Sequence, residues 1–330
     1  MEMSMIKKLS HITKVEIIPT SPFHFDSTAY KPGHFPSSDT KWKHGKRWQT
    51  MLWREKTLGL ILENVGCVDS PKILLHIYSN KPLLQNFVDS LVREVNYRYN
   101  LQLDLESFYN CFQNDAQLAP VLQKFRGLRS MHPGSLYEYL IIAIVLQNTT
   151  VRRSVNMMQA LFEKYGTLVR FNNKNFFCFW EPQVLAQRPE QELRELKVGY
   201  RAKSLIRVSE SFTDGQIDEL VLRGRGQQKQ EDALLSLYGV GSASVGYIMF
   251  DVFHHWDYLR HISPWEQKIY TKLFFNRDYH KEVVPVSEMF SYFETKYGNY
   301  KALAIHYVWE DLWWKRRNKR IPWLEELIRL

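Results

Sequence analysis

The stretch "LYGVGSASVGYIMF", residues 237–250, places two glycines two positions apart between two apolar, helix-like segments. Gly239 and Gly241 suit a tight turn between helices, because glycine adopts backbone conformations that side chains disfavour. The turn leaves unpaired N–H groups at the start of the second helix, where a phosphate can dock. The same spacing also fits a glycine-capped turn that binds nothing. An amphipathic helix precedes Gly239, which argues against a dinucleotide-binding βαβ unit.

The size and charge of the chain narrow the possible partners. Its 330 residues are enough for two or three modest domains. The formal net charge of +9 favours a polyanionic partner such as nucleic acid. With 10 Trp, 18 Tyr and 19 Phe, the chain has many flat surfaces for a core or for stacking on bases. Composition therefore favours nucleic-acid binding without proving it.

The cysteines and the apolar runs indicate the compartment. Cys67, Cys111 and Cys178 are odd in number and widely spaced, which argues against disulfides, a zinc site or an iron–sulfur cluster. The first 17 residues lack the apolar core of a signal peptide. The longest apolar run, residues 139–146, is too short to cross a bilayer. We expect an intracellular, soluble protein without a membrane partner or a metal.

The pattern along the chain predicts an α+β fold. Short runs rich in β-branched and aromatic residues predict strands at 14–19, 47–53, 58–64 and 72–79. Helical patterns dominate from about residue 119. Ser135, Thr149 or Thr150 are expected to cap helices, and Gly166 to end one. We expect an antiparallel β-sheet domain at residues 1–118 and an all-helical body at 119–330, with a helix–hairpin–helix at about 231–253.

The turn at Tyr238-Gly-Val-Gly241 resembles the helix–hairpin–helix of the DNA glycosylase (HhH-GPD) superfamily, whose hairpin commonly reads Leu-Pro-Gly-Val-Gly. Residues 125–166, 193–212 and 297–314 are similar, in order, to helices of its 8-oxoguanine and 3-methyladenine glycosylase branch. That branch also has a strand-rich, TBP-like N-terminal domain. The resemblance implies a monomeric base-excision repair enzyme that flips a damaged purine out of duplex DNA and cleaves its N-glycosidic bond.

The resemblance also implies a set of DNA contacts. The hairpin amides would grip one phosphate, and a structural monovalent cation could sit there; no other cofactor is implied. An asparagine would fill the hole left by the flipped base, two arginines would hold the orphaned cytosine, and a tyrosine would wedge beside them. These contacts favour oxidised guanine opposite cytosine, with alkylated purines as the alternative. The residues at the matching positions are Gly239, Val240, Gly241 and Ser242 at the hairpin, then Asn148, Arg153, Arg201 and Tyr200.

Two catalytic groups of the family are replaced. The family aspartate that stabilises the sugar cation corresponds to Ser263, a neutral residue. Ser263 and Glu266 form a capping-box pattern, so Glu266 is either the substitute carboxylate or a structural cap. Asp257, six residues upstream of Ser263, is the other candidate. The family's nucleophilic lysine corresponds to Ala243, which implies hydrolysis without lyase activity.

A flipped base needs aromatic walls. Ile305, His306 and Trp309 near the C-terminus, with Trp265 beside the helix cap, are the candidates, although such residues are more often core. The basic segments 41–48 and 315–320 either contact phosphates or form solvated faces. Because of Ser263 and Ala243, a DNA-binding protein that has lost the chemistry is the competing hypothesis.

Overall fold

The computed structural model describes residues 6–328. A five-stranded antiparallel sheet with strand order β2-β6-β5-β4-β3 forms one side of the molecule. The four predicted strands are present, and a fifth, β3, lies between the first two of them, in the segment 21–48 that was expected to be a loop. The strands are β2 (His11–Ile17), β3 (Thr40–Lys43), β4 (Lys46–Trp53), β5 (Lys56–Asn64) and β6 (Ile73–Ser79).

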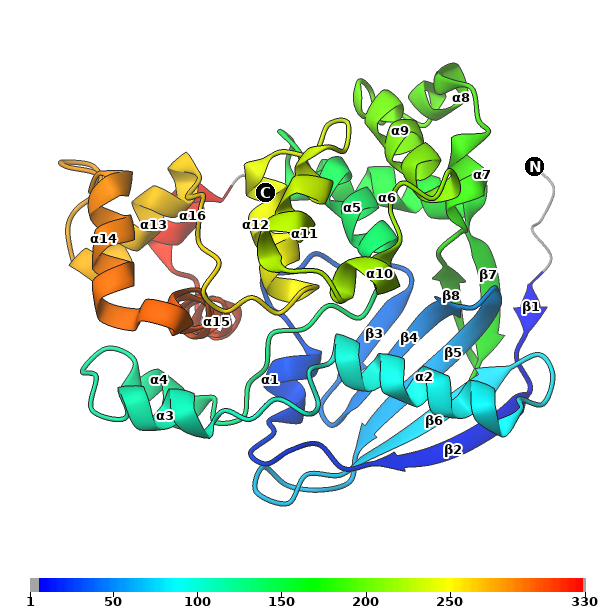
Figure 1. Cartoon of the computed structure of the whole chain (residues 1–330), viewed down its shortest axis with the longest axis horizontal. Helices are drawn as coiled ribbons and strands as arrows, with labels where there is room; N and C mark the ends of the chain where they lie inside the picture. Colours follow the sequence, from blue (N-terminus) through cyan, green and yellow to red (C-terminus); the bar gives the residue numbers. More distant parts are fainter. Residues whose placement is uncertain (1–5, 329–330) are drawn as a thin grey trace.

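Helix α2 (Gln85–Arg98) lies across one face of this sheet (Figure 1). Alternate residues of β5 and β6, such as Leu60 and Ile77, point to this face and are fully buried. They pack with Leu91 and Val95 of the helix in one apolar cluster. The period of two in the strands and the apolar stripe of the helix therefore meet in a common core.

A second sheet covers the opposite face and was not predicted. It contains β1 (Lys7–Lys8), β7 (Thr167–Phe171) and β8 (Lys174–Cys178), in the order β1-β7-β8. The β7–β8 hairpin turns at Asn172 and Asn173, which both have positive φ as such two-residue turns require. Its Phe171 packs against Gly59, where no side chain intervenes. The α+β class is confirmed, but the part expected to be all-helical contains this hairpin.

The helices begin and end largely where their caps predict. Ser135 accepts a hydrogen bond from the Glu138 N–H, Thr150 accepts one from the Arg153 N–H, and Gly166 follows α6. The remaining elements are α1 (Phe25–Ala29), α3 (Glu106–Phe112), α4 (Ala119–Lys124), α5 (Leu136–Leu146), α6 (Val151–Tyr165), α7 (Pro182–Ala186), α8 (Glu190–Glu195), α9 (Arg201–Thr213), α10 (Glu219–Arg223), α11 (Gln227–Leu235), α12 (Ser242–Asp251), α13 (Pro264–Phe275), α14 (Val286–Tyr297), α15 (Lys301–Asn318) and α16 (Pro322–Leu327).

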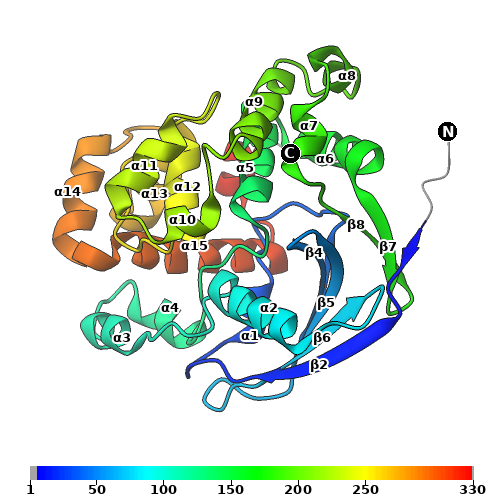
Figure 2. The ribbon, with the colours of Figure 1, turned by 45° about the vertical axis from the view of Figure 1, so that its right-hand side comes forward.

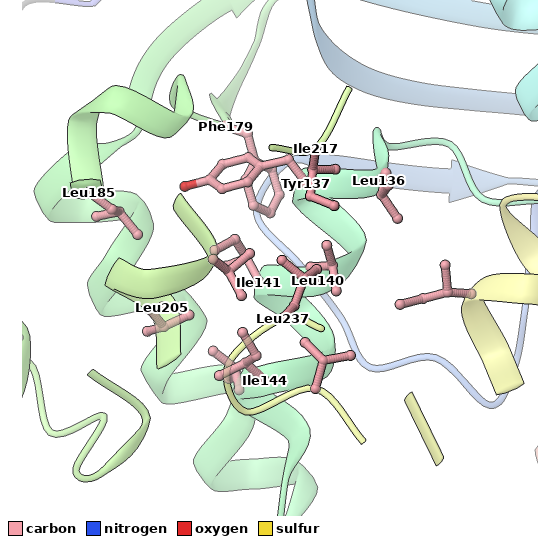
Figure 3. Close-up of a cluster of buried hydrophobic side chains, with 14 of the residues drawn as sticks. Leu136, Tyr137, Leu140, Ile141, Ile144, Phe179, Leu185, Leu205, Ile217 and Leu237 are labelled. Carbon is pink, nitrogen blue, oxygen red and sulfur yellow. The ribbon is translucent and has the colours of Figure 1, made fainter. Parts of the chain in front are cut away.

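Two apolar clusters hold these helices. The first surrounds α5, whose Leu140, Ile141 and Ile144 are fully buried, and it includes Leu237 just before the two glycines (Figure 3). The second joins α3 and α4 to α13–α15, and α15 runs beneath α10–α13 in Figure 2. None of the helices in residues 6–328 has an apolar stretch long enough to cross a bilayer.

Apart from Met131, the buried residues of the sheet cluster end at Leu101, and the α13–α15 cluster begins at Leu105. Helix α3 thus packs with the C-terminal helices, through contacts such as Phe112 with Tyr297. The expected domain boundary at residue 118 stays a prediction. About a dozen residues before it, the chain leaves the core of the sheet and joins the core around α13–α15.

Candidate active site

The turn between α11 and α12 has the geometry of an anion site. Gly239 has a φ of 81°, in the left-handed region, and its carbonyl accepts a hydrogen bond from Gln147 Nε2 at 2.7 Å. Gly241 is the N-cap of α12, and no side chain caps that helix. Val240 is buried and anchors the turn in the core around α5. The first N–H groups of α12 therefore face outward from a rigid turn, as phosphate binding requires.

We predict that Gly239→Ala destabilises this turn. A Cβ at this position would lie 2.8 Å from the Cβ of Ser204, and the positive φ disfavours any side chain. The free energy of unfolding should fall by about 1–3 kcal/mol, and affinity for duplex DNA should fall with it. Gly246→Ala is the matched control, because nothing lies within 4 Å of a Cβ there and alanine favours the helix. Equal melting temperatures for the two variants would contradict the prediction.

Asn148 and Tyr200 lie together at the surface. Asn148, between α5 and α6, has a φ of 47° and an exposed side chain. Its Nδ2 lies 3.4 Å from the hydroxyl of Tyr200, whose side chain is 52% exposed at the start of α9. Asparagine tolerates the left-handed conformation better than most residues. The structure therefore presents a planar amide and a planar ring side by side, as insertion into a base stack requires.

The two arginines differ from each other. Arg153 is exposed in the first turn of α6. Arg201 is buried, and its guanidinium donates hydrogen bonds to the carbonyls of Gln147 and Val198. It thereby holds the segment that carries Asn148. Contact of Arg201 with a cytosine stays a prediction, and it requires the guanidinium to turn outward.

The capping box at the start of α13 is present. Glu266 Oε2 accepts hydrogen bonds from the Ser263 N–H at 2.8 Å and from the Ser263 hydroxyl at 2.5 Å. Its Oε1 accepts one from the hydroxyl of Tyr247. Glu266 is buried, and both of its oxygens contact side chains that solvent reaches, Ser263 and Tyr247. Ser242 of the hairpin lies 3.3 Å from His261 Nδ1, which connects the anion site to this cap.

Asp257 and Ala243 occupy different surroundings. Asp257 Oδ1 accepts a hydrogen bond from Gln227 Nε2 at 3.1 Å, at the start of α11. Ala243 is exposed in the first turn of α12. Lys229, a lysine upstream of the hairpin, lies exposed on α11 and does not match the position of the family's nucleophile. No amine therefore occupies the position of the family's nucleophile.

Two aromatic side chains pack together near the start of α13. The rings of Trp265, which is 38% exposed, and Trp309 are 5.3 Å apart and nearly perpendicular. Ile305 is buried in the core around α15, and His306 Nε2 lies 3.1 Å from Lys31 Nζ. Burial first, and then the charge of Lys31, holds the pKa of His306 well below its ordinary value. Pocket roles for these residues stay predictions.

Sequence reasoning missed Tyr247 and Asp251 on α12. They follow Ala243 at intervals of four residues, so all three lie on one face of the helix. That spacing was the available signal. The side chains that donate hydrogen bonds to the Asp251 carboxylate come from distant segments, namely Tyr139 on α5 and Ser130 before it.

The basic segments are partly committed to internal contacts. Lys43 and Lys46 lie 5.7 and 5.9 Å from the centre of the Trp48 ring. Arg316 pairs with Glu325 at 2.7 and 3.0 Å. Within residues 6–328, no group of three or more His, Cys, Asp or Glu side chains is placed to hold a metal ion.

Comparison with known proteins places this geometry in a family. The model of the HhH-GPD superfamily of base excision DNA repair proteins matches residues 141–327. A DNA-3-methyladenine glycosylase of Bacillus subtilis (strain 168) is 20% identical over 190 residues, which are 57% of this chain and 63% of the relative. The match thus spans just under two thirds of that relative.

Two solved structures have a similar fold. A 3-methyladenine DNA glycosylase from Archaeoglobus fulgidus superposes with a TM-score of 0.71 at 13% identity, covering 89% of this chain and 97% of that one. An 8-oxoguanine glycosylase/lyase from Clostridium acetobutylicum, in complex with DNA containing cytosine opposite 8-oxoguanine, gives 0.68 at 16% identity, covering 95% and 99%.

Proposed function

This chain belongs to the HhH-GPD superfamily of base excision DNA repair proteins, and from this membership we propose that it is a DNA N-glycosylase that removes a damaged purine. The hairpin amides bind a phosphate, and Asn148 and Tyr200 enter the space that the flipped base leaves. Ala243 makes it a hydrolase without lyase activity. Hydrolysis of the N-glycosidic bond needs no cofactor.

The observation that supports a particular class of substrate is the capping box of α13. Ser263 is neutral, and both oxygens of Glu266 already accept hydrogen bonds. The charge available to a sugar cation is therefore weaker than that of a free carboxylate. A base that carries its own positive charge leaves more readily, so we propose an N-alkylated purine as the substrate. Oxidised guanine is the second candidate, which the exposed Arg153 near Asn148 supports.

In the proposed reaction, the Ser263 hydroxyl acts as a relay: it passes the electrostatic effect of the Glu266 charge to the sugar. Glu266 accepts its proton in a hydrogen bond and leaves the oxygen lone pairs electron-rich. As the C1′–N9 bond breaks, its electrons pass to the purine and cancel the positive charge there. Water then adds to C1′, and its proton passes to solvent. Glu266 is a positioning residue in this scheme, because it acts through Ser263.

Single-turnover release from defined duplexes tests the function. Duplexes with 7-methylguanine, 3-methyladenine or 8-oxoguanine opposite their normal partners are incubated with excess protein. We expect release of the two alkylated bases and slower release of 8-oxoguanine. Tight binding of all three duplexes without release of any base would support the competing hypothesis of a DNA-binding protein without activity.

We predict that Glu266→Gln lowers the single-turnover rate about tenfold or more, because the amide removes the charge behind Ser263. Stability should fall by about 1–3 kcal/mol, since the amide N–H₂ would face a donor from which the carboxylate oxygen now accepts a hydrogen bond. Asp257→Asn is the control and should keep the wild-type rate. A Glu266→Gln variant that remains folded, as judged by its melting temperature, and has the full rate would exclude the relay.

A further inference from the structure

One face of α12 leads from the hairpin into the interior. Ala243, Tyr247 and Asp251 recur at intervals of four residues along it. Ala243 stands beside the anion site, and Tyr247 donates its hydroxyl proton to Glu266 behind the Ser263 cap. Asp251, one turn further, therefore lies beyond the sugar position, where an extruded base would arrive.

The carboxylate of Asp251 is incompletely satisfied. Oδ2 accepts a hydrogen bond from the Tyr139 hydroxyl at 2.9 Å, and Oδ1 accepts a long one from the Ser130 hydroxyl at 3.4 Å. A carboxylate offers about four acceptor positions, so about two stay free. In the part of the chain that the structure describes, no Lys, Arg or His nitrogen lies within 4 Å of it.

Around Asp251, the negatively charged side chains outnumber the positively charged ones. The charge of Lys31 acts on Asp251, but its Nζ lies 3.7 Å from Glu310 Oε1, 3.1 Å from His306 Nε2 and 3.2 Å from the Arg129 carbonyl oxygen. Glu310 is buried, and its Oε2 has no partner. One lysine thus faces two carboxylates, and Glu310 holds it.

The histidines nearby do not balance this charge. Burial lowers the pKa of His34 to about 4 and that of His132 to about 3, and it holds the pKa of His306 well below its ordinary value. All three are neutral at pH 7. Burial also raises the pKa of Asp251 to about 6, with Lys31, Tyr139 and Ser130 opposing the rise, so Asp251 is mostly ionised at pH 7.

Solvent reaches the Asp251 side chain. It is partly exposed, and Tyr247, one helical turn before it, is 44% exposed although burial raises the pKa of its hydroxyl well above 10. A molecule that approaches this face of α12 from solvent can therefore reach both side chains.

We propose that Asp251 is a specificity-determining residue that contacts the extruded base and, as a carboxylate, pairs with the positive charge of an N-alkylated purine. The proposal rests on the proposed function and names the group that reads its substrate. A neutral purine beside Asp251 would leave the carboxylate without a partner, at a cost. Asp251 therefore both selects a cationic base and discriminates against undamaged purines.

Binding of two duplexes that cannot be cleaved tests the proposal apart from catalysis. One carries 2′-fluoro-7-methylguanosine, which keeps the positive charge, and the other carries 7-methyl-7-deazaguanosine, a neutral base of the same shape. We expect wild type to bind the cationic duplex about tenfold more tightly at pH 7. Asp251→Asn should bind both equally, and Asp251→Glu should restore part of the preference. Asp214→Asn, at an exposed position just after α9, should keep all of it.

The preference should also depend on pH. Asp251 is charged above its pKa of about 6, so the preference is complete near pH 7 and disappears as the pH falls to 5. His132 and His306 stay neutral throughout this range and do not produce the change. His34 is exposed and burial also raises the pKa of Glu310, so His34→Gln and Glu310→Gln are the controls and should keep the pH dependence. With these controls, the wild-type titration tests the role of Asp251 even if Asp251→Asn fails to fold.

The outcomes separate the two proposals. A wild-type protein without preference, or a folded Asp251→Asn variant that keeps it, overturns the role of Asp251. A preference that depends on Asp251 in a protein that releases no base from cleavable duplexes overturns the enzyme and supports the base contact.

Discussion

Replacing Glu94 with Gln should lower the free energy of unfolding by about 3–5 kcal/mol. Glu94 on α2 is 4% exposed and accepts two hydrogen bonds from Arg223 at 2.7 Å each and one from Arg98 at 2.6 Å. The amide removes the charge that the two guanidinium groups share, and its N–H₂ would face another donor. The loss is large because the buried Arg98 loses its carboxylate partner and Arg223 keeps only Glu219.

Chemical denaturation checks this value against a surface pair. Glu190→Gln breaks an exposed i,i+4 contact with Arg194 and should cost at most about 0.5 kcal/mol. We call the ion pairs of Glu94 with Arg98 and Arg223 the Glu94 cluster. A Glu94→Gln variant as stable as Glu190→Gln would show that this cluster, which joins α2 to α10, contributes nothing to stability. We also expect weaker DNA binding by Glu94→Gln, because α10 leads directly into the helices of the hairpin.

The stability that the Glu94 cluster contributes depends on pH. Burial raises the pKa of Glu94, but hydrogen bonding to Arg223 and the charges of Arg98 and Arg223 outweigh it, so the pKa lies below its ordinary value. A depressed carboxyl pKa contributes stability above the unfolded pKa of about 4.3, and this is lost as the pH falls through the folded value. The Glu94→Gln variant should therefore lose less stability than wild type between pH 5 and 3. Parallel curves would contradict this.

The strands of the sheet could be predicted closely because their signal is local. The expected strand at 47–53 is β4 at 46–53, and that at 58–64 is β5 at 56–64. The turn between them uses Arg54 and Glu55 at positive φ, where sequence statistics favour asparagine and glycine. The β7–β8 hairpin was missed although its Asn172-Asn173 turn is a recognisable signal, because helices flank it on both sides.

The site was predictable only where local rules decide it. The Ser263 capping box and the conformation of the Gly239 turn follow from neighbouring residues, and both are present. The inward direction of Arg201 depends on the Gln147 carbonyl, 54 residues away. The character of Asp251 depends in the same way on Tyr139 and on the placement of Lys31. Pairwise contacts across the chain, which no spacing rule records, account for what was missed.

The double variant Ser263→Asp/Glu266→Gln should release 8-oxoguanine about 100-fold faster than wild type. Aspartate is as good an N-cap as serine, so it can take over the cap of α13. The new glutamine can donate its N–H₂ to the new carboxylate, where Glu266 now accepts from Ser263. A free negative charge then faces the sugar, and a neutral base no longer needs its own charge to leave.

Ser263→Asp alone should fail to give this gain. The new carboxylate would stand where the Ser263 hydroxyl now lies 2.5 Å from Glu266, so two like charges would meet unless they shared a proton. Stability should fall by about 1–3 kcal/mol, and the rate should stay near that of wild type. Single-turnover rates of both single variants and the double variant complete the cycle. A single Ser263→Asp variant as fast as the double variant would show that Glu266 does not interact with the side chain at position 263. A double variant no faster than wild type would show that position 263 does not face the sugar.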